Sequence, residues 1–141
     1  MIEVVLDTNV LVAAFRSSLG VSHRLIQDLE SASWRPVISP ALALEYEAVL
    51  KRLPLEYGFT IEDIDDFLDY LFSRSTLVQI YFSWRPSLRD PNDDRILEVA
   101  VRAQCPVVTF NRKDFDGAAR FGITVLSPKE FLIRLTHPAW I

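Results

Sequence analysis

Short apolar runs rich in β-branched residues alternate with longer amphipathic segments along this chain. The runs are too short for amphipathic helices and are typical of strands buried on both faces. The longer segments repeat apolar residues at helical spacing. Strands separated by helices pair in parallel, because parallel neighbours need crossover connections. The alternation therefore predicts an α/β fold, a three-layer α/β/α sandwich with a central parallel sheet of four or five strands.

The expected elements follow one another without a repeat or a linker. Three helix starts carry a capping signal: Ser39 and Ser127 each precede a Pro at the first helical position, and Thr60 precedes a turn rich in acids. Thr8 is expected to cap the first helix. Strands are predicted at residues 2–6, 36–38, 76–82, 105–109 and 122–126, and helices at 9–15, 21–29, 40–51, 61–72, 92–103 and 128–135.

Length and composition favour one globular domain over residues 1–141. The chain is 50% hydrophobic and 24% charged, and a chain of this length needs neither a disulfide nor a metal to stabilise its core. Cys105 is expected to be an inert core residue. Charges interrupt every apolar run, so no signal peptide and no membrane-spanning segment is predicted. We expect a cytoplasmic protein with no membrane partner.

The charge balance argues against binding to nucleic acid through a broad basic surface. Fifteen Lys and Arg residues stand against nineteen Asp and Glu residues, which gives a formal charge of −4. Carboxylates gathered around a divalent cation are neutralised by it, so a metal-dependent enzyme acting on nucleic acid remains compatible with this charge. The positions of the acids therefore matter more than their sum.

Acidic residues follow each of the first four predicted strands. Asp7 directly follows the first strand, Glu45 lies in the helix after the second, Asp93 begins the helix after the third, and Asp114 follows the fourth. The carboxyl ends of parallel strands meet at one edge of a sheet, so these acids are expected to converge there. Taken singly, each has a plain structural explanation as a cap, a surface residue or a turn.

The third acidic segment places Asp90, Asp93 and Asp94 within five residues. Like charges this close raise one another's pKa unless a cation lies between them. Oxygen ligands favour Mg²⁺ or Mn²⁺, and His23 and His137 lack the spacing of a transition-metal site. Carboxylates around such ions are typical of phosphodiester hydrolysis by a metal-activated water.

In order and spacing, the four acidic segments resemble the motifs of PIN-domain ribonucleases. The resemblance covers essentially the whole chain and is strongest to small prokaryotic toxins of the VapC type and related PIN toxin components of toxin–antitoxin systems. The segments that carry it are Asp7-Thr8-Asn9-Val10-Leu11, Glu45 within residues 39–46, residues 90–94 with Ile96, Leu97 and Ala100, and residues 109–115.

The resemblance implies a Mg²⁺- or Mn²⁺-dependent ribonuclease that acts as a toxin. Asn111 stands where many PIN domains have Asp, which leaves open whether one or two ions bind. Asp93 is preferred to Asp94 because its distance from Ala100 and Thr109 matches the family's third acid. The implied catalytic and metal-binding acids are Asp7, Glu45, Asp93 and Asp114. The implied supporting residues are Asp90, Asp94 and Asn111, together with Thr8, Ser39 and Thr109 as hydroxyls that orient the carboxylates. Arg112 and Lys113 are phosphate-binding candidates, with two solvated charges as the alternative.

The resemblance also implies an RNA substrate, a cognate antitoxin protein and a homodimer. Two other functions stay open. One is a non-catalytic PIN-like module that binds RNA or protein. The other is a phosphatase with Asp7 as nucleophile, which Asn9 weakens because such enzymes carry a second Asp at that position. The acidic helix at residues 62–69 is expected to expose its acids, and Trp34, Trp84 and Trp140 are expected in the core or an interface rather than stacked on bases.

Overall fold

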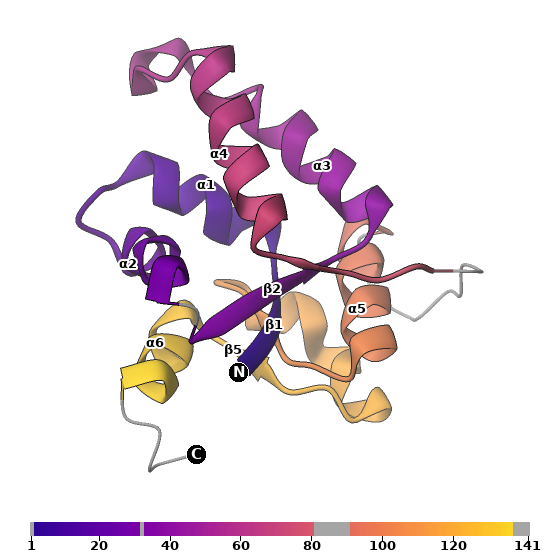
Figure 1. Ribbon diagram of the computed structural model, residues 1–141. Coiled ribbons are helices and arrows are strands. Elements are labelled where there is room, and N and C mark those ends of the chain that lie inside the picture. Colours follow the sequence, from indigo (N-terminus) through magenta and orange to yellow (C-terminus); the bar gives the residue numbers. More distant parts are fainter. Residues whose placement is uncertain (1, 32, 81–90, 137–141) are drawn as a thin grey trace.

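The computed structural model of the chain (Figure 1) describes residues 2–31, 33–80 and 91–136. Five strands form one all-parallel sheet in the order β3-β2-β1-β4-β5, which confirms the predicted sheet. The first strand in sequence order, β1, lies at the centre of the sheet. The strands are β1 (Ile2–Leu6), β2 (Trp34–Ile38), β3 (Thr76–Leu77), β4 (Val107–Val108) and β5 (Val125–Leu126).

The position of β1 in the sheet explains the short apolar run at the start of the sequence. Val4, Val5 and Leu6 are fully buried. On one side β1 pairs with β2, with Val4 opposite Pro36, and on the other side it pairs with β4, with Leu6 opposite Val108. With neighbours on both sides and helices on both faces, the second half of the strand, Val4–Leu6, offers no place for a solvated side chain, whereas Glu3 in its first half is partly exposed.

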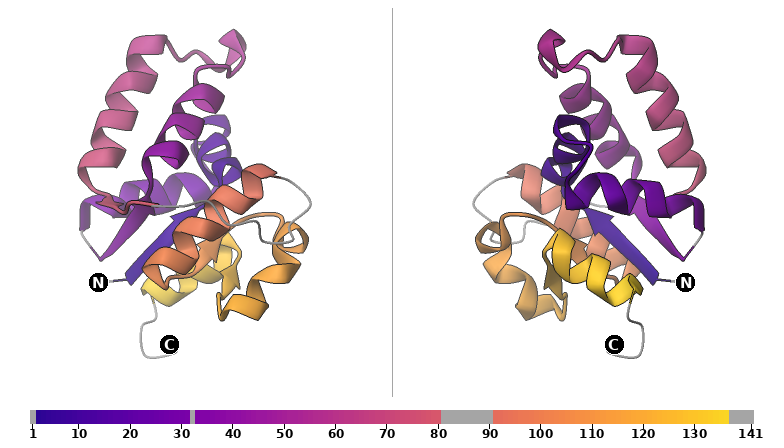
Figure 2. Two further views of the ribbon diagram at one scale, coloured as in Figure 1. Left: turned by 90° about the vertical axis from the view of Figure 1, so that its right-hand side faces the viewer. Right: turned by 90° about the vertical axis from the view of Figure 1, so that its left-hand side faces the viewer.

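Helices cover both faces of the sheet, as the three-layer prediction requires. In Figure 2 one panel shows α5 and the η3 segment in front of the sheet, and the opposite panel shows α2 and α6. The packed pair α3 and α4 extends beyond the sheet (Figure 1). The α-helices are α1 (Thr8–Arg16), α2 (Val21–Asp28), α3 (Pro40–Leu50), α4 (Ile61–Ser73), α5 (Pro91–Ala103) and α6 (Pro128–Thr136), and the 3₁₀ segments are η1 (Leu29–Ser31), η2 (Leu55–Tyr57) and η3 (Arg112–Phe121).

Local capping signals fix three of the helix starts. The Ser39 hydroxyl accepts a hydrogen bond from the Leu42 amide at 3.1 Å, and Thr60 forms a reciprocal capping box with Asp63. Ser127 forms the same kind of box at the start of α6. The cap predicted at Thr8 is wrong: Asp7 occupies the N-cap position, and Thr8 lies in the first turn with its hydroxyl bonded to Glu45.

Two other predicted segments differ in the structure. β3 ends at Leu77, earlier than the predicted strand, because as an edge strand it pairs only with the end of β2; residues 81 and 82 lie outside the described residues. The stretch expected to be a plain loop after β4 continues into η3, which begins with the Asp114 amide donating to the Asn111 carbonyl and ends at Gly122, where φ is +73°.

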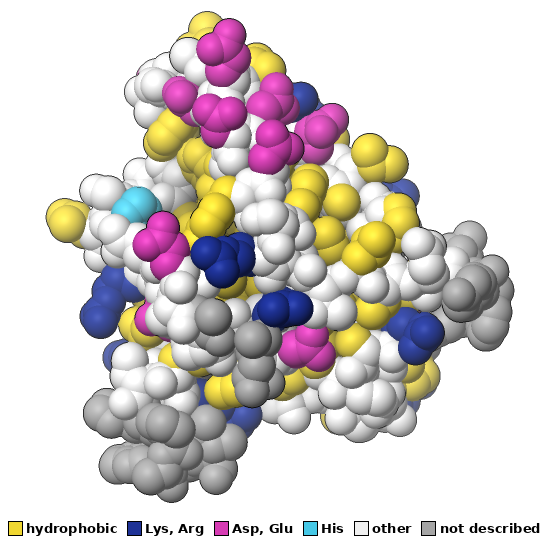
Figure 3. Space-filling view, viewed as in Figure 1, with side chains coloured by type: hydrophobic (Ala, Val, Ile, Leu, Met, Phe, Trp, Pro, Cys, Tyr) yellow, Lys and Arg dark blue, Asp and Glu magenta, His cyan; other side chains and the backbone are white. Residues whose placement is uncertain are grey.

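The core and the acidic helix agree with the sequence expectations. Trp34 is buried against Phe131 in an edge-to-face contact, while Trp84, Trp140 and His137 lie outside the described residues. Burial, together with the nearby Glu3 charge, raises the pKa of the Cys105 thiol to about 12, which keeps it neutral. Figure 3 shows carboxylates gathered over α4. The opposite face of this helix buries Ile64, Leu68 and Leu71. No helix in the described part of the chain has the length and apolarity to cross a bilayer.

Candidate metal centre

The site is built where the strand order reverses. The chain runs outward from β1 through β2 to β3, and then returns to the other side of β1 with β4 and β5. Asp7 immediately follows β1, Thr109 immediately follows β4, and the Asp7 amide donates to the Val108 carbonyl at 2.9 Å. In open parallel sheets this reversal leaves a crevice outside the carboxyl ends of the strands, where ligands bind.

Asp7 is a carboxylate held in a largely buried position. Its side chain accepts a hydrogen bond from the Thr109 hydroxyl at 2.6 Å, and the residue is 8% exposed. Burial raises the pKa of Asp7, the bond from Thr109 opposes that rise, and the charge of Glu45 adds to it. A cation beside Asp7 would offset the unfavourable burial of its charge.

Glu45 lies on α3 and turns toward the same region. Its Oε2 atom accepts a hydrogen bond from the Thr8 hydroxyl at 2.8 Å, and its Oε1 atom lies 3.7 Å from Nη1 of Arg95. The Glu45 side chain is only 11% exposed. The Thr8 bond therefore joins the residue after Asp7 directly to the second acid.

A second hydrogen bond joins α3 to the end of β1. The hydroxyl of Tyr46, the residue after Glu45, is buried and donates to the carbonyl oxygen of Leu6, the residue before Asp7, at 2.5 Å. Burial raises the pKa of Tyr46 well above its usual value, and the charges of Asp7 and Glu45 add to this rise. The hydroxyl consequently stays protonated and remains a donor.

Asp7, Glu45 and Asp93 line one cavity of about 730 Å³. The acids reach it from the end of β1, from α3 and from the first turn of α5. An apolar wall formed by α3 and α1 adjoins them, and Figure 3 shows hydrophobic side chains exposed over α3. The other lining residues are Thr8, Asn9, Val12, Ala41, Leu44, Ala48, Val49, Arg52, Arg95 and Ile96.

The donor set of this cavity fits a hard divalent cation. Asn9 Oδ1 and Glu45 Oε1 are buried, and neither accepts a hydrogen bond from any described residue. Oxygen donors of this kind are the ligands of Mg²⁺ and Mn²⁺. Within the described residues, however, no three His, Cys, Asp or Glu side chains are already close enough to hold one ion. Binding one therefore requires the side chains to converge further.

Most of the other predicted site residues lie outside this cavity. Asp94 is buried but does not contribute to its lining, and Asn111 and Asp114 are exposed on and beside η3. Among the described residues, Asn111 connects to the site through its amide, which donates to the Thr109 hydroxyl at 3.0 Å. The bond of Ser39 is to the backbone of α3 rather than to a carboxylate. Asp90 lies outside the described residues.

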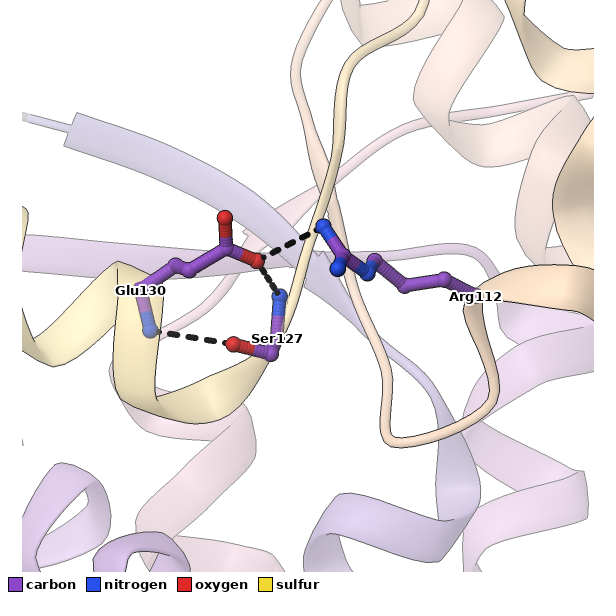
Figure 4. Close-up of polar contacts among 3 residues, drawn as sticks. All are labelled: Arg112, Ser127 and Glu130. Atoms are coloured by element: carbon purple, nitrogen blue, oxygen red, sulfur yellow. Dashed lines mark hydrogen bonds and ion pairs between the residues drawn. The ribbon is translucent and has the colours of Figure 1, made fainter.

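Arg112 is committed to another contact. Its Nη1 atom lies 3.0 Å from Oε1 of Glu130, and the same oxygen accepts a hydrogen bond from the Ser127 amide at 2.9 Å (Figure 4). The bond from the Ser127 amide lowers the pKa of Glu130, and the Arg112 charge contributes. Arg112 thus ties η3 to the start of α6, and its exposed neighbour Lys113 does not line the cavity either.

Arg52, Arg95 and Asn9 are lining residues that the sequence reasoning missed. Arg52 lies two residues beyond the end of α3, and its side chain is placed by the hydrogen bond that Nε donates to the Ala48 carbonyl at 2.9 Å, a contact that the sequence does not signal. Arg95 directly follows the third acidic segment. Asn9 follows the N-cap residue Asp7 by two residues, and this spacing alone does not predict that the two side chains share a cavity.

Comparison with known proteins identifies the family. A family model described as a PIN domain matches residues 3–113, a segment that contains Asp7, Glu45, Asp93 and Thr109. No curated protein sequence gives a match.

Three solved structures share the fold at low sequence identity. VapBC2 from Rickettsia felis, bound to a DNA fragment from its promoter, has a TM-score of 0.59 at 20% identity, covering 90% of this chain and 98% of that one. DNA-bound VapBC from Salmonella typhimurium has a TM-score of 0.62 at 17% identity, with coverages of 91% and 99%. VapBC-1 from nontypeable Haemophilus influenzae has a TM-score of 0.59 at 16% identity, with coverages of 92% and 99%. The chain therefore belongs to the PIN-domain family, as the order of its acidic motifs indicates.

Proposed function

We propose that this protein is a Mg²⁺- or Mn²⁺-dependent ribonuclease, the toxin of a toxin–antitoxin pair, which hydrolyses RNA phosphodiester bonds. One observation carries the proposal: Asp7, Glu45 and Asp93, from three separate elements, line a single cavity at the switch point of the sheet. Membership of the PIN-domain family supports it, since PIN domains generally use divalent metal ions.

The three carboxylates would hold the ion. A divalent ion at such a site supplies a bound water of lowered pKa and a positive charge beside the phosphate. Thr109 holds Oδ2 of Asp7 and Thr8 holds Oε2 of Glu45, so Oε1 of Glu45, which accepts no hydrogen bond from any described residue, would be available to the ion. Asp114 would contribute only after η3 moves toward the cavity, and Asp90 and Asp94 would support the site electrostatically.

The partners we propose are an RNA substrate, a cognate antitoxin and a second copy of the chain, in the cytoplasm. The three VapBC neighbours support the antitoxin partner, because VapBC proteins are toxin–antitoxin complexes. The apolar wall beside the acids gives the RNA a surface where bases can lie while the phosphate approaches the carboxylates.

The test is cleavage of an RNA panel that includes tRNA, by purified protein in Mn²⁺, Mg²⁺ or EDTA. Asp7→Asn and Asp93→Asn are expected to lose at least about 100-fold in rate, because each removes a charged ligand of the ion. Asp66→Asn, the same change at an exposed acid on α4, is the matched control and is expected to cleave like the parent protein.

Equal cleavage by all four proteins would point to a contaminating nuclease, and no cleavage with either ion would favour the non-catalytic binding module. Either result contradicts the proposal. A phosphatase would instead release phosphate through an aspartyl-phosphate intermediate, which mass spectrometry of the acid-quenched protein detects.

A further inference from the structure

The ion pair of Arg95 with Glu45 lies inside the proposed metal site. Both residues line the cavity, and the guanidinium lies 3.7 Å from Oε1 of Glu45. This is the carboxylate oxygen that accepts no hydrogen bond from any described residue, whereas Oε2 is held by Thr8. The guanidinium is thus beside the oxygen that is left for an ion.

The pair also differs in burial from other ion pairs of the molecule. In Lys51–Asp65 and Arg112–Glu130 all four side chains are between 31% and 58% exposed, as is usual for surface pairs of small energetic effect. Glu45 is 11% exposed while Arg95 is 52% exposed. A half-exposed arginine therefore neutralises a largely buried carboxylate.

Arg95 and a divalent ion cannot both occupy the same side of Glu45. Their charges have the same sign, and repulsion at a few ångströms is a substantial energy even in a partly hydrated site. Arg95 itself lines the cavity, so a guanidinium displaced from Glu45 would still be near it, and its planar set of N–H donors matches the oxygens of a phosphate. The phosphate-binding candidates from the sequence, Arg112 and Lys113, do not line the cavity.

We propose that Arg95 exchanges one anion for another: it neutralises Glu45 in the metal-free protein, competes there with the divalent ion, and contacts a phosphate of the RNA once the ion has displaced it. The RNA part of this inference rests on the proposed function. The competition part concerns the metal alone, so the two can fail separately.

The first test is binding of Mn²⁺ without RNA, measured by titration calorimetry or by the loss of the free-ion electron paramagnetic resonance signal. Arg95→Gln is expected to bind Mn²⁺ roughly three- to tenfold more tightly, because a competing positive charge is gone. Arg95→Lys keeps the charge and is expected to bind Mn²⁺ like the parent protein. Arg102→Gln, an exposed arginine two turns further along α5, is the matched control and is expected to leave the affinity unchanged.

The second test is the KM for RNA at saturating Mn²⁺. Both Arg95→Gln and Arg95→Lys are expected to raise KM roughly tenfold, since each loses the forked contact to phosphate. A merely structural role for Arg95 would not tighten metal binding while weakening RNA binding. An unchanged or weaker Mn²⁺ affinity in Arg95→Gln, or an unchanged KM, overturns the exchange. If the parent protein binds Mn²⁺ but cleaves no RNA, tighter binding by Arg95→Gln upholds the competition while the ribonuclease proposal fails.

Discussion

At the residue scale, Asp7 makes folding less favourable because its carboxylate is buried, while the same carboxylate is the proposed ligand of the metal ion. Burial raises the pKa of its carboxyl, and the Glu45 charge adds to that effect, so the folded chain holds the ionised form at a disadvantage. Thr109 offsets part of this disadvantage with a hydrogen bond to Oδ2. For packing alone, a neutral side chain would be more favourable than Asp7 at this buried position. A carboxylate kept there is typical of a site that binds a cation.

The pH dependence of stability follows from the direction of this shift. As the pH rises above about 4, the unfolded chain ionises at Asp7 before the folded chain does, so the folded protein loses relative stability until its own carboxyl has ionised. In EDTA at pH 7, Asp7→Asn is therefore expected to be more stable than the parent protein, with the difference shrinking toward acid pH. Urea unfolding at a series of pH values measures this difference in the free energy of unfolding, with Asp66→Asn as the control. A less stable Asp7→Asn at pH 7 would contradict the shift.

Tyr46 offers a second prediction at the residue scale. Tyr46→Phe leaves the buried Leu6 carbonyl without its hydroxyl donor and is expected to lower the free energy of unfolding by about 1–2 kcal/mol. Tyr70→Phe is the matched control, because the Tyr70 hydroxyl is buried and no described residue forms a hydrogen bond with it. That change is expected to be neutral or stabilising. Equal losses in the two variants would show that the Tyr46 bond has no special effect.

The elements show which parts of the fold are determined locally. The strand β1, the existence of β4 within the predicted residues 105–109, and the caps at Ser39, Thr60 and Ser127 depend on neighbours in the sequence and were predictable; β4 itself is shorter, Val107–Val108. The length of β3 and the hydroxyl bond of Thr8 depend on partners far along the chain. For the same reason the sequence did not reveal that Arg112 pairs with Glu130, or that Arg95 lies beside Glu45.

The sequence suggests two roles for the Ser39 hydroxyl, as a helix cap and as a group that orients the carboxylates, and a substitution can distinguish them. In the structure it caps α3, the helix that carries Glu45. Ser39→Ala is expected to lower the free energy of unfolding by about 1 kcal/mol and to leave the Mn²⁺ affinity within about twofold of the parent value. Thermal unfolding and a Mn²⁺ titration check the two parts. A large loss of Mn²⁺ affinity at unchanged stability would instead favour a hydroxyl that orients the carboxylates.

At the scale of the whole molecule, the all-parallel sheet brings three of the four predicted acids to one cavity, while Asp114 lies outside it. Asp7, Glu45 and Asp93 are separated by 38 and 48 residues, yet they line one cavity because successive strands end at the same edge of the sheet. This convergence was predictable from the alternation of strands and helices. The cations that share the cavity, Arg52 and Arg95, were not, since a long flexible side chain is placed by its contacts rather than by its element.

The most direct test of the central claim is the position of the metal. Crystals grown with Mn²⁺ and measured at a wavelength where manganese scatters anomalously are expected to show a peak bounded by carboxylate oxygens of Asp7, Glu45 and Asp93, with Arg95 withdrawn from Glu45. A crystal with no peak in this cavity at saturating Mn²⁺, or with its peak elsewhere on the protein, would contradict the account.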